Sequence, residues 1–127
     1  MKPLKKIMLV EDETDIQTVA KMALEITGGF QVEICGLGGE ALIKAKSFSP
    51  DLILLDVMMP DMDGLSVIKS LRENSSTALI PVIFMTARMQ SQDVLDYDQL
   101  GAIGFIAKPF DPMQLSATVK KIWEKKG

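Results

Sequence analysis

Four sets of polar residues each follow a short apolar run, and their side chains could carry out phosphoryl chemistry. The sets are Glu11-Asp12, Asp56, Thr86 and Lys108. They supply carboxylates, a hydroxyl and an ammonium group. Ionised carboxylates repel one another unless a cation joins them, and an oxygen-rich site is what a hard divalent ion takes. If these sets meet, we expect a site for Mg²⁺, with Mn²⁺ as the second choice.

Asp56 is the residue on which such a site would act. Its carboxylate can serve as a nucleophile and form an acyl phosphate. Glu11 and Asp12 can hold the metal ion beside it. Lys108 and the hydroxyl of Thr86 can bind the remaining phosphoryl oxygens. Phosphoryl transfer depends mainly on positioning and charge neutralisation, so this set predicts a metal-dependent phosphoryl-accepting site.

Each of these residues has a simpler interpretation when it is taken alone. A strand-end Asp is often a helix cap, and an acidic turn such as Glu11-Asp12 often only favours the start of the next helix. A lone hydroxyl is usually structural, a lone lysine is usually a surface charge, and Phe105 alone would be a core residue. Their joint occurrence at matching strand ends favours the functional interpretation.

Short apolar segments predict the strands that must position these groups. Continuous apolar runs at residues 7–10, 52–55 and 82–85 are typical of strands buried on both faces. A shorter run at 105–107 predicts another strand. Residues 30–34 alternate between apolar and polar side chains, which predicts a strand at the edge of the sheet.

Helical periodicity fills the intervals between the strands. The helical segments lie at residues 15–27, 41–45, 65–71, 94–100 and 115–122. Gly28-Gly29 ends the first helix, and Asp111-Pro112 supplies a cap and a first-turn proline for the last. Alternating strands and helices predict an α/β fold with a parallel sheet and helices on both faces. Ligands bind such sheets beyond the carboxyl ends of the strands, where the four polar sets fall.

Composition excludes several classes of protein. The chain has 127 residues, of which 47% are hydrophobic and 24% charged, as in a single globular domain covering residues 1–127. A net charge of −3 without a basic stripe argues against direct nucleic-acid binding. The absence of histidine excludes a histidine base, metal ligand or phosphoryl carrier within this chain.

The expected cellular setting follows from the cysteine and the first residues. Cys35 is the one cysteine, so it cannot form an internal disulfide, and we expect it in the core. The apolar stretch near the start is too short for a secretory signal or a membrane span. We therefore expect a cytoplasmic protein without membrane contact.

The polar sets and the residues beside them resemble the receiver domain of two-component response regulators. The resemblance rests on Glu11-Asp12, the segment 56–60 followed by Gly64, Thr86-Ala87 and Lys108-Pro109, and it spans almost the whole chain. It implies a flavodoxin-like (βα)5 three-layer sandwich with strand order 2-1-3-4-5. It also implies that Asp56 takes a phosphoryl group from a phosphohistidine on a sensor histidine kinase or histidine phosphotransfer protein.

The same resemblance assigns further roles. It implies that the backbone carbonyl of Met58 completes the Mg²⁺ site and that the Lys108–Pro109 peptide is cis. Thr86 and Phe105 would form the switch pair, which rearranges when Asp56 is phosphorylated. A downstream protein would then read the surface of the fourth helix, fifth strand and fifth helix, with the chain a monomer or a phosphorylation-linked dimer.

Several positions add expectations of their own. Glu11 stands where the family often has Asp, so we expect a slightly different metal geometry. The apolar side chain of Met58 cannot align a hydrolytic water, which predicts slower self-dephosphorylation than in a Met58→Asn variant. We expect Arg88 to overhang the site and modulate access, and Trp123 to be partly exposed at a partner or dimer surface. Gly36 to Gly39 predict the turn after the edge strand.

Four functions compete. The leading one is a phosphorylatable switch that acts through protein contacts and catalyses only its own phosphorylation and dephosphorylation. The chain could instead be the receiver part of a larger regulator or a hybrid kinase. A phosphatase of the haloacid-dehalogenase type would need an acid where Met58 stands. An interaction module that keeps only the fold would not need Asp56, Thr86 and Lys108 together.

Overall fold

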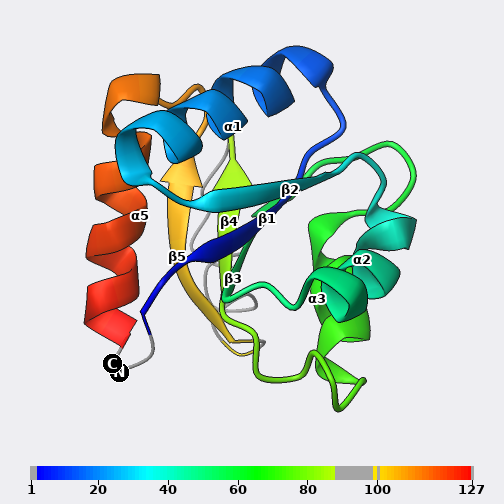
Figure 1. The fold of residues 1–127 in the computed structure, drawn as a ribbon. Helices are drawn as coiled ribbons and strands as arrows, with labels where there is room; N and C mark the ends of the chain where they lie inside the picture. Colours follow the sequence, from blue (N-terminus) through cyan, green and yellow to red (C-terminus); the bar gives the residue numbers. More distant parts are fainter. Residues whose placement is uncertain (1–2, 88–98, 100, 127) are drawn as a thin grey trace.

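A parallel sheet of five strands forms the centre of the molecule (Figure 1). The structure is a computed structural model, and it describes residues 3–87, 99 and 101–126. The strands are β1 (Lys6–Val10), β2 (Gln31–Cys35), β3 (Leu52–Asp56), β4 (Val82–Thr86) and β5 (Ala102–Ala107). They lie in the order β2-β1-β3-β4-β5, and each neighbouring pair is parallel. The predicted fold class and strand order are therefore confirmed.

Burial follows the patterns that predicted the strands. Every residue of β3 and β4 is buried, as a strand covered on both faces requires. In the edge strand β2, Gln31 and Glu33 are exposed while Val32 and Cys35 are buried. Phe30 lies just before this strand rather than in it. The strand β5 starts at Ala102, earlier than the apolar run alone predicted.

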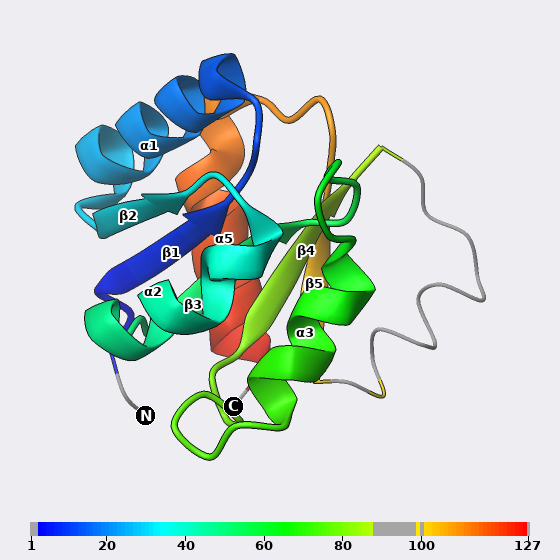
Figure 2. The same cartoon turned by 90° about the vertical axis from the view of Figure 1, so that its right-hand side faces the viewer.

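Helices cover both faces of the sheet, which gives the predicted three layers. The helices are α1 (Thr14–Gly28), α2 (Ala41–Phe48), α3 (Gly64–Arg72) and α5 (Pro112–Lys126), with a short 3₁₀ helix η1 (Gly38–Glu40) before α2. Figures 1 and 2 show α1 and α5 on one face and α2 and α3 on the other. The predicted helix at 94–100 lies outside the described residues, apart from Gln99.

Each helical layer closes its own core cluster against the sheet. One cluster joins α1 and α5 to side chains such as Leu9, Leu54 and Met85. The other, here called the α2–α3 cluster, joins α2 and α3 to Met8, Phe84 and Cys35, which confirms the core position of the cysteine. Alternate side chains of a strand point to opposite faces, so β1, β3 and β4 contribute to both clusters.

The end of α1 and the start of α5 are where the sequence placed their signals, and the structure adds a cap at the start of α3. Gly29 follows α1 in the left-handed conformation, with φ 71°. Asp63 caps α3 by accepting a hydrogen bond of 2.8 Å from the Ser66 amide. Asp111 accepts one of 2.9 Å from the Met113 amide, with Pro112 at the first position of α5. The caps of Asp63 and Asp111 hold the starts of α3 and α5 near the carboxyl edge of the sheet.

Trp123 differs from the prediction. Its side chain is 6% exposed and packs in the cluster between α1, α5 and the sheet. Helical spacing explains this. Leu115, Val119 and Trp123 follow one another at intervals of four residues, so they lie on the same face of α5. It is therefore a core residue and supports no partner or dimer surface.

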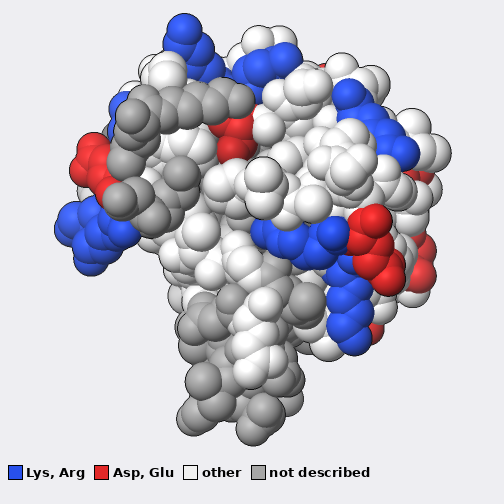
Figure 3. Space-filling model, turned by 90° about the horizontal axis from the view of Figure 1, so that it is seen from below, with Lys and Arg blue, Asp and Glu red and all other residues white. Residues whose placement is uncertain are grey.

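Two surface properties of the described residues bear on function. None of the helices described is long and apolar enough to cross a membrane. On the face seen in Figure 3, basic side chains are separated by uncharged and acidic ones, without a continuous basic patch among the residues shown in colour.

Candidate functional site

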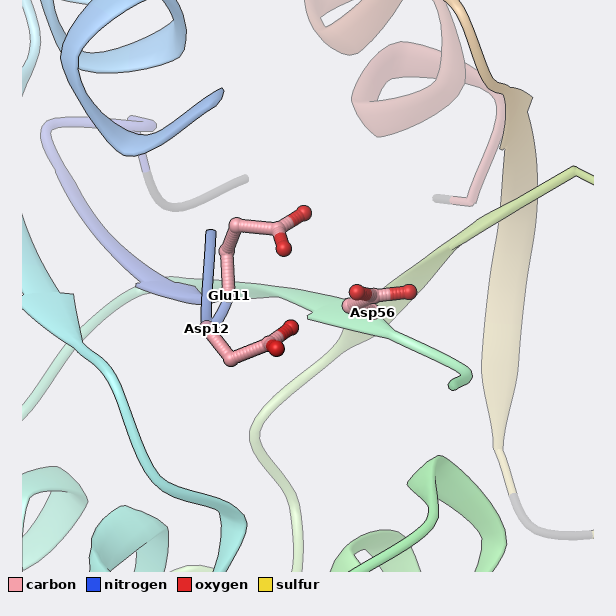
Figure 4. Close-up of side chains that lie close together, drawn as sticks. All are labelled: Glu11, Asp12 and Asp56. Carbon is pink, nitrogen blue, oxygen red and sulfur yellow. The ribbon is translucent and has the colours of Figure 1, made fainter. Parts of the chain in front are cut away.

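Three carboxylates meet at the carboxyl edge of the sheet. Glu11 and Asp12 follow β1 and Asp56 ends β3, and these strands are neighbours in register. One oxygen from each carboxylate lies within 4.8 Å of the other two, and Figure 4 shows the side chains gathered around one space. Glu11 is 0% exposed and Asp56 3% exposed, so water screens their charges poorly.

Lys108 brings a positive charge to this cluster from the end of β5. Its Nζ lies 2.9 Å from Glu11 Oε1 and 3.2 Å from Asp56 Oδ2. The Lys108 amide also donates a hydrogen bond of 2.9 Å to the carbonyl of Thr86, which continues the pairing of β4 and β5 into the site. The Lys108–Pro109 peptide is cis, as the resemblance implied.

Burial and charge pull the ionisation of this site in opposite directions. Burial raises the pKa of Glu11 to about 7, although the hydrogen bond from Lys108 opposes the change. Burial alone would lower the pKa of Lys108, but its hydrogen bond to Glu11 and the charges of Glu11 and Asp56 outweigh that effect and raise the pKa. The positive charge of Lys108 therefore does not offset the burial of Glu11, while the Lys108 ammonium group is held ionised.

A set of backbone contacts fixes Glu11. Its amide donates to the Cys35 carbonyl at 3.0 Å, and its own carbonyl accepts a hydrogen bond of 2.6 Å from Gln17 Nε2 of α1. Its Oε2 accepts from the Glu13 amide at 3.2 Å. Sequence reasoning missed Gln17, because only the turn of α1 over the strand end brings its amide to that carbonyl.

The predicted switch residues share one face of the sheet. Thr86 is buried at the end of β4, and strand alternation puts it on the same side as Phe84. Phe84 pairs in register with Phe105 of β5, and their rings stack with centroids 6.1 Å apart. Phe105 is half-buried and packs against the α2–α3 cluster. The hydroxyl and the ring thus lie on adjoining strands on the α3 side.

Met58 lies next to the central carboxylate. Its amide donates a hydrogen bond of 3.2 Å to Asp56 Oδ1, and its side chain is 73% exposed. The chain turns sharply here, because Gly64 donates back to the Val57 carbonyl at 2.8 Å. A Cβ on Gly64 would lie 2.9 Å from Val57 Cα, so only glycine allows this closure. Arg88 lies outside the described residues.

The donor set fits a divalent cation. The ligating atoms of Glu11, Asp12 and Asp56 are carboxylate oxygens, which Mg²⁺ and Mn²⁺ prefer. Among the described residues at the site, Lys108 supplies one positive charge to balance these carboxylates. A divalent ion would correct that imbalance, which gives the acidic cluster the character of a metal site.

Comparison with known proteins gives a consistent result. The family model described as the response regulator receiver domain matches residues 7–120. The alkaline phosphatase synthesis transcriptional regulatory protein PhoP of Bacillus subtilis is 41% identical over 93% of this chain and 48% of its own length. The response regulator Rre1 of Synechocystis is 34% identical over 91% of this chain and 50% of its own length. The chain thus spans about half the length of these curated relatives.

Solved structures match over nearly their whole length. The chemotaxis protein CheY4 of Vibrio cholerae superimposes with a TM-score of 0.86 at 30% identity, covering 94% of this chain and 99% of that one. A CheY-like receiver domain protein of Methanospirillum hungatei gives a TM-score of 0.83 at 30% identity, covering 98% of this chain and 100% of that one.

Proposed function

The chain belongs to the family of response regulator receiver domains, and we propose that Asp56 is the residue of this chain that accepts the phosphoryl group. The family consists of phosphorylation switches of two-component signalling rather than enzymes that turn over an external substrate. The observation that carries the assignment of Asp56 is its set of contacts: its carboxylate lies in the cluster with Glu11 and Asp12, one oxygen contacts Lys108 Nζ, and the other accepts a hydrogen bond from the Met58 amide.

This site supplies the nucleophile and the side chains that position it. An Asp56 carboxylate oxygen attacks the phosphorus of a phosphohistidine on a donor protein, the P–N bond breaks, and the donor imidazole leaves with its electron pair. Lys108 then pairs with a phosphoryl oxygen in place of its present contact with Asp56. The Met58 amide orients the carboxylate for attack through its hydrogen bond to Asp56 Oδ1.

Glu11, Asp12 and Asp56 would hold Mg²⁺, with the Met58 carbonyl as a further ligand. When bound, the ion supplies charge neutralisation for the carboxylate and the incoming phosphoryl oxygens. The burial of Glu11 makes that neutralisation necessary, because its charge faces little water. Mn²⁺ would serve the same donors.

Phosphorylation would act on Thr86 and Phe105. A phosphoryl group on Asp56 adds acceptor oxygens toward which the Thr86 hydroxyl can move. Phe105, stacked on Phe84 on the same face, would then turn into the space beside Thr86. The surface around β5 and α5, with the predicted helix at 94–100, would change shape for a downstream protein.

Exposed apolar side chains suggest where the phosphoryl donor docks. Met22 and Ile26 of α1 are 54% and 74% exposed, and they line a cavity of about 310 Å³ together with Met113 of α5. A second cavity of about 220 Å³ is bordered by Ile16 and Lys108. Because a donor must cover Asp56, we propose that a sensor histidine kinase or histidine phosphotransfer protein binds over α1 and the start of α5.

We propose that residues 1–127 act as one receiver unit, alone or within a longer protein. The transcriptional regulators among its relatives are about twice as long as the matched part. In a longer protein of that kind, we propose that DNA binding would belong to an attached output module. The unit itself would signal through protein contacts.

Intact-mass measurement after incubation with Mg²⁺ and acetyl phosphate or phosphoramidate tests the central proposal. We expect the wild type to gain one phosphoryl group, and the gain to need Mg²⁺ and to be lost in Asp56→Asn. Asp63→Asn is the matched control, because it removes a carboxylate from the same loop without touching the cluster, and it should still be phosphorylated. A wild type that gains no mass would contradict the proposal and favour an interaction module.

A further inference from the structure

Asp61 joins two loops that come from different parts of the chain. It lies in the loop between β3 and α3, downstream of Asp56. Its Oδ1 accepts a hydrogen bond of 3.1 Å from the Gly38 amide, and its Oδ2 accepts one of 3.0 Å from the Gly39 amide. Both carboxylate oxygens therefore hold the turn that begins η1. The Gly39 hydrogen bond lowers the pKa of Asp61; loss of hydration at the carboxylate opposes this, and the Gly38 hydrogen bond adds to the lowering.

The two loops touch as closely as their backbones permit. A Cβ built on Gly38 would lie 3.0 Å from both Met62 Cβ and the Met62 carbonyl oxygen. Only a residue without a side chain fits there without displacing the neighbouring loop. The close approach lets the short Asp61 side chain reach both amides, so glycine at position 38 and aspartate at position 61 form one structural unit.

The loop that Asp61 holds also carries the Met58 peptide. On one side of Asp61, Met59 is buried in the α2–α3 cluster with Cys35 and Ala41. On the other side, the Gly64 amide closes the loop onto the Val57 carbonyl. The Met58 amide between these anchors contacts Asp56 Oδ1. A shift of the loop would therefore move the group that orients the central carboxylate.

We propose that Asp61 is a positioning residue for phosphoryl transfer at Asp56. By fixing the β3–α3 loop to the turn before η1, it keeps the Met58 peptide in register with Asp56 and with the metal ligands. Asp61 itself touches neither the carboxylate cluster nor the phosphoryl group. This role rests on the proposed function of Asp56 and adds a residue to it.

Asp63 provides the comparison that separates positioning from plain stability. It lies in the same loop, is exposed like Asp61 and carries the same charge, but its hydrogen bond goes to Ser66 of its own helix. Removing either carboxylate weakens the same long-range attraction for Mg²⁺ and removes local hydrogen bonds. Only the loss of Asp61 removes the hydrogen bonds between this loop and the η1 turn.

The experiment compares Asp61→Ala, Asp61→Asn and Asp63→Ala with the wild type. Mg²⁺ affinity is measured by calorimetry, and the initial rate of phosphorylation by acetyl phosphate is measured by intact mass. Outer groups that hold ligands in place typically change metal affinity or activity by 10-fold or more, so we expect Asp61→Ala to lose about 10-fold in both quantities. Asp63→Ala should stay within about twofold of the wild type in affinity and rate. Asp61→Asn keeps one acceptor oxygen and should fall between the wild type and Asp61→Ala.

Two results would overturn the proposal. One is an Asp61→Ala protein that matches Asp63→Ala in affinity and rate. The other is an Asp61→Asn protein that loses as much affinity and rate as Asp61→Ala. The acceptor oxygen that Asn retains would then contribute nothing to either quantity. Circular dichroism of each variant establishes that it is folded. If the wild type took up no phosphoryl group, the proposed function would fail, while the Mg²⁺ affinities would still test positioning by Asp61.

Discussion

Glu11 is the side chain whose ionisation matters most at the residue scale. Its carboxylate is fully buried, and burial raises its pKa to about 7 in the absence of a metal ion. The ordinary value is 4.5, so the folded protein holds this proton more tightly than the unfolded chain. This group therefore contributes stability that is fully present below pH 4.5 and is lost as the pH rises through about 7. A bound cation would reverse the preference, because it favours the ionised form.

Mg²⁺ affinity should consequently depend on pH near neutrality. A proton on Glu11 competes with the ion, so binding at pH 6 should be about tenfold weaker than at pH 8. Calorimetric titrations at pH 6, 7 and 8 measure this dependence. In Glu11→Gln the affinity should be weak at every pH and nearly constant over this range. An unchanged pH dependence in the variant would show that another group titrates.

The sequence predicted the residues of the site better than the residues that support them. Glu11, Asp12, Asp56 and Lys108 lie at strand ends, and a parallel sheet brings strand ends to one edge regardless of loop detail. Asp61 depends on amides more than twenty residues away, and nothing near it in the chain points to them. The roles of Thr86, Phe105 and Met58 remain predictions, as does that of Arg88.

At the scale of elements, the close packing of β5 against α5 limits which side chains fit between them. The strand β5 lies against α5 at Gly104, where a Cβ would stand 2.7 Å from Ile122 Cγ2. Ile122 is half-buried against the core cluster, so it cannot move away freely. The glycine therefore allows α5 to approach the strand that carries Phe105 and Lys108.

Gly104→Ala should lower the free energy of unfolding by about 1–3 kcal/mol, as expected of an overpacked site. Adding Ile122→Ala removes the opposing Cγ2 atom, so the double variant should lose less than the sum of the single losses. Urea denaturation followed by circular dichroism measures all three. Gly39→Ala is the matched control, because its Cβ would meet only Asp61 Oδ2 at 3.6 Å. Strict additivity would contradict this account of the contact.

Element positions were predictable because burial repeats with the period of each element. The runs at 52–55 and 82–85 have no polar interruption, and the structure buries β3 and β4 completely. The prediction for Trp123 was wrong although the same helical spacing could have placed it beside Leu115 and Val119. A large aromatic near the end of a chain gives no sign of whether a cavity exists to receive it.

At the scale of the whole molecule, the metal-free protein carries an uncompensated cluster of negative charge. Among the described residues, the ion pairs of Lys108 in this cluster are with Glu11 and Asp56. The three carboxylates still lie within 4.8 Å of one another. Folding therefore costs repulsion that the unfolded chain does not have, and stability depends on the cation supply.

Asp12→Asn should stabilise the metal-free protein by about 1 kcal/mol, because it removes one repulsive charge while sparing the Lys108 contacts. The wild type should gain about 1.4 kcal/mol when Mg²⁺ exceeds its dissociation constant tenfold, and the variant should gain much less. Thermal denaturation with and without Mg²⁺ tests both expectations. Asp15→Asn, in the first turn of α1 and outside the cluster, removes the same charge and should keep the full Mg²⁺ response. Equal responses in Asp12→Asn and the wild type would contradict a role in metal binding.

The burial of Trp123 determines what the intrinsic fluorescence of this protein can report. It is the one tryptophan in the chain, and it lines a cavity with Pro50 and Pro81, which precede β3 and β4. Five-residue strands of roughly 16 Å separate that edge from Asp56. The indole emission should therefore shift to the red on unfolding but barely respond to Mg²⁺ or to phosphorylation. Trp123 fluorescence should thus report the folding of this protein independently of its phosphorylation.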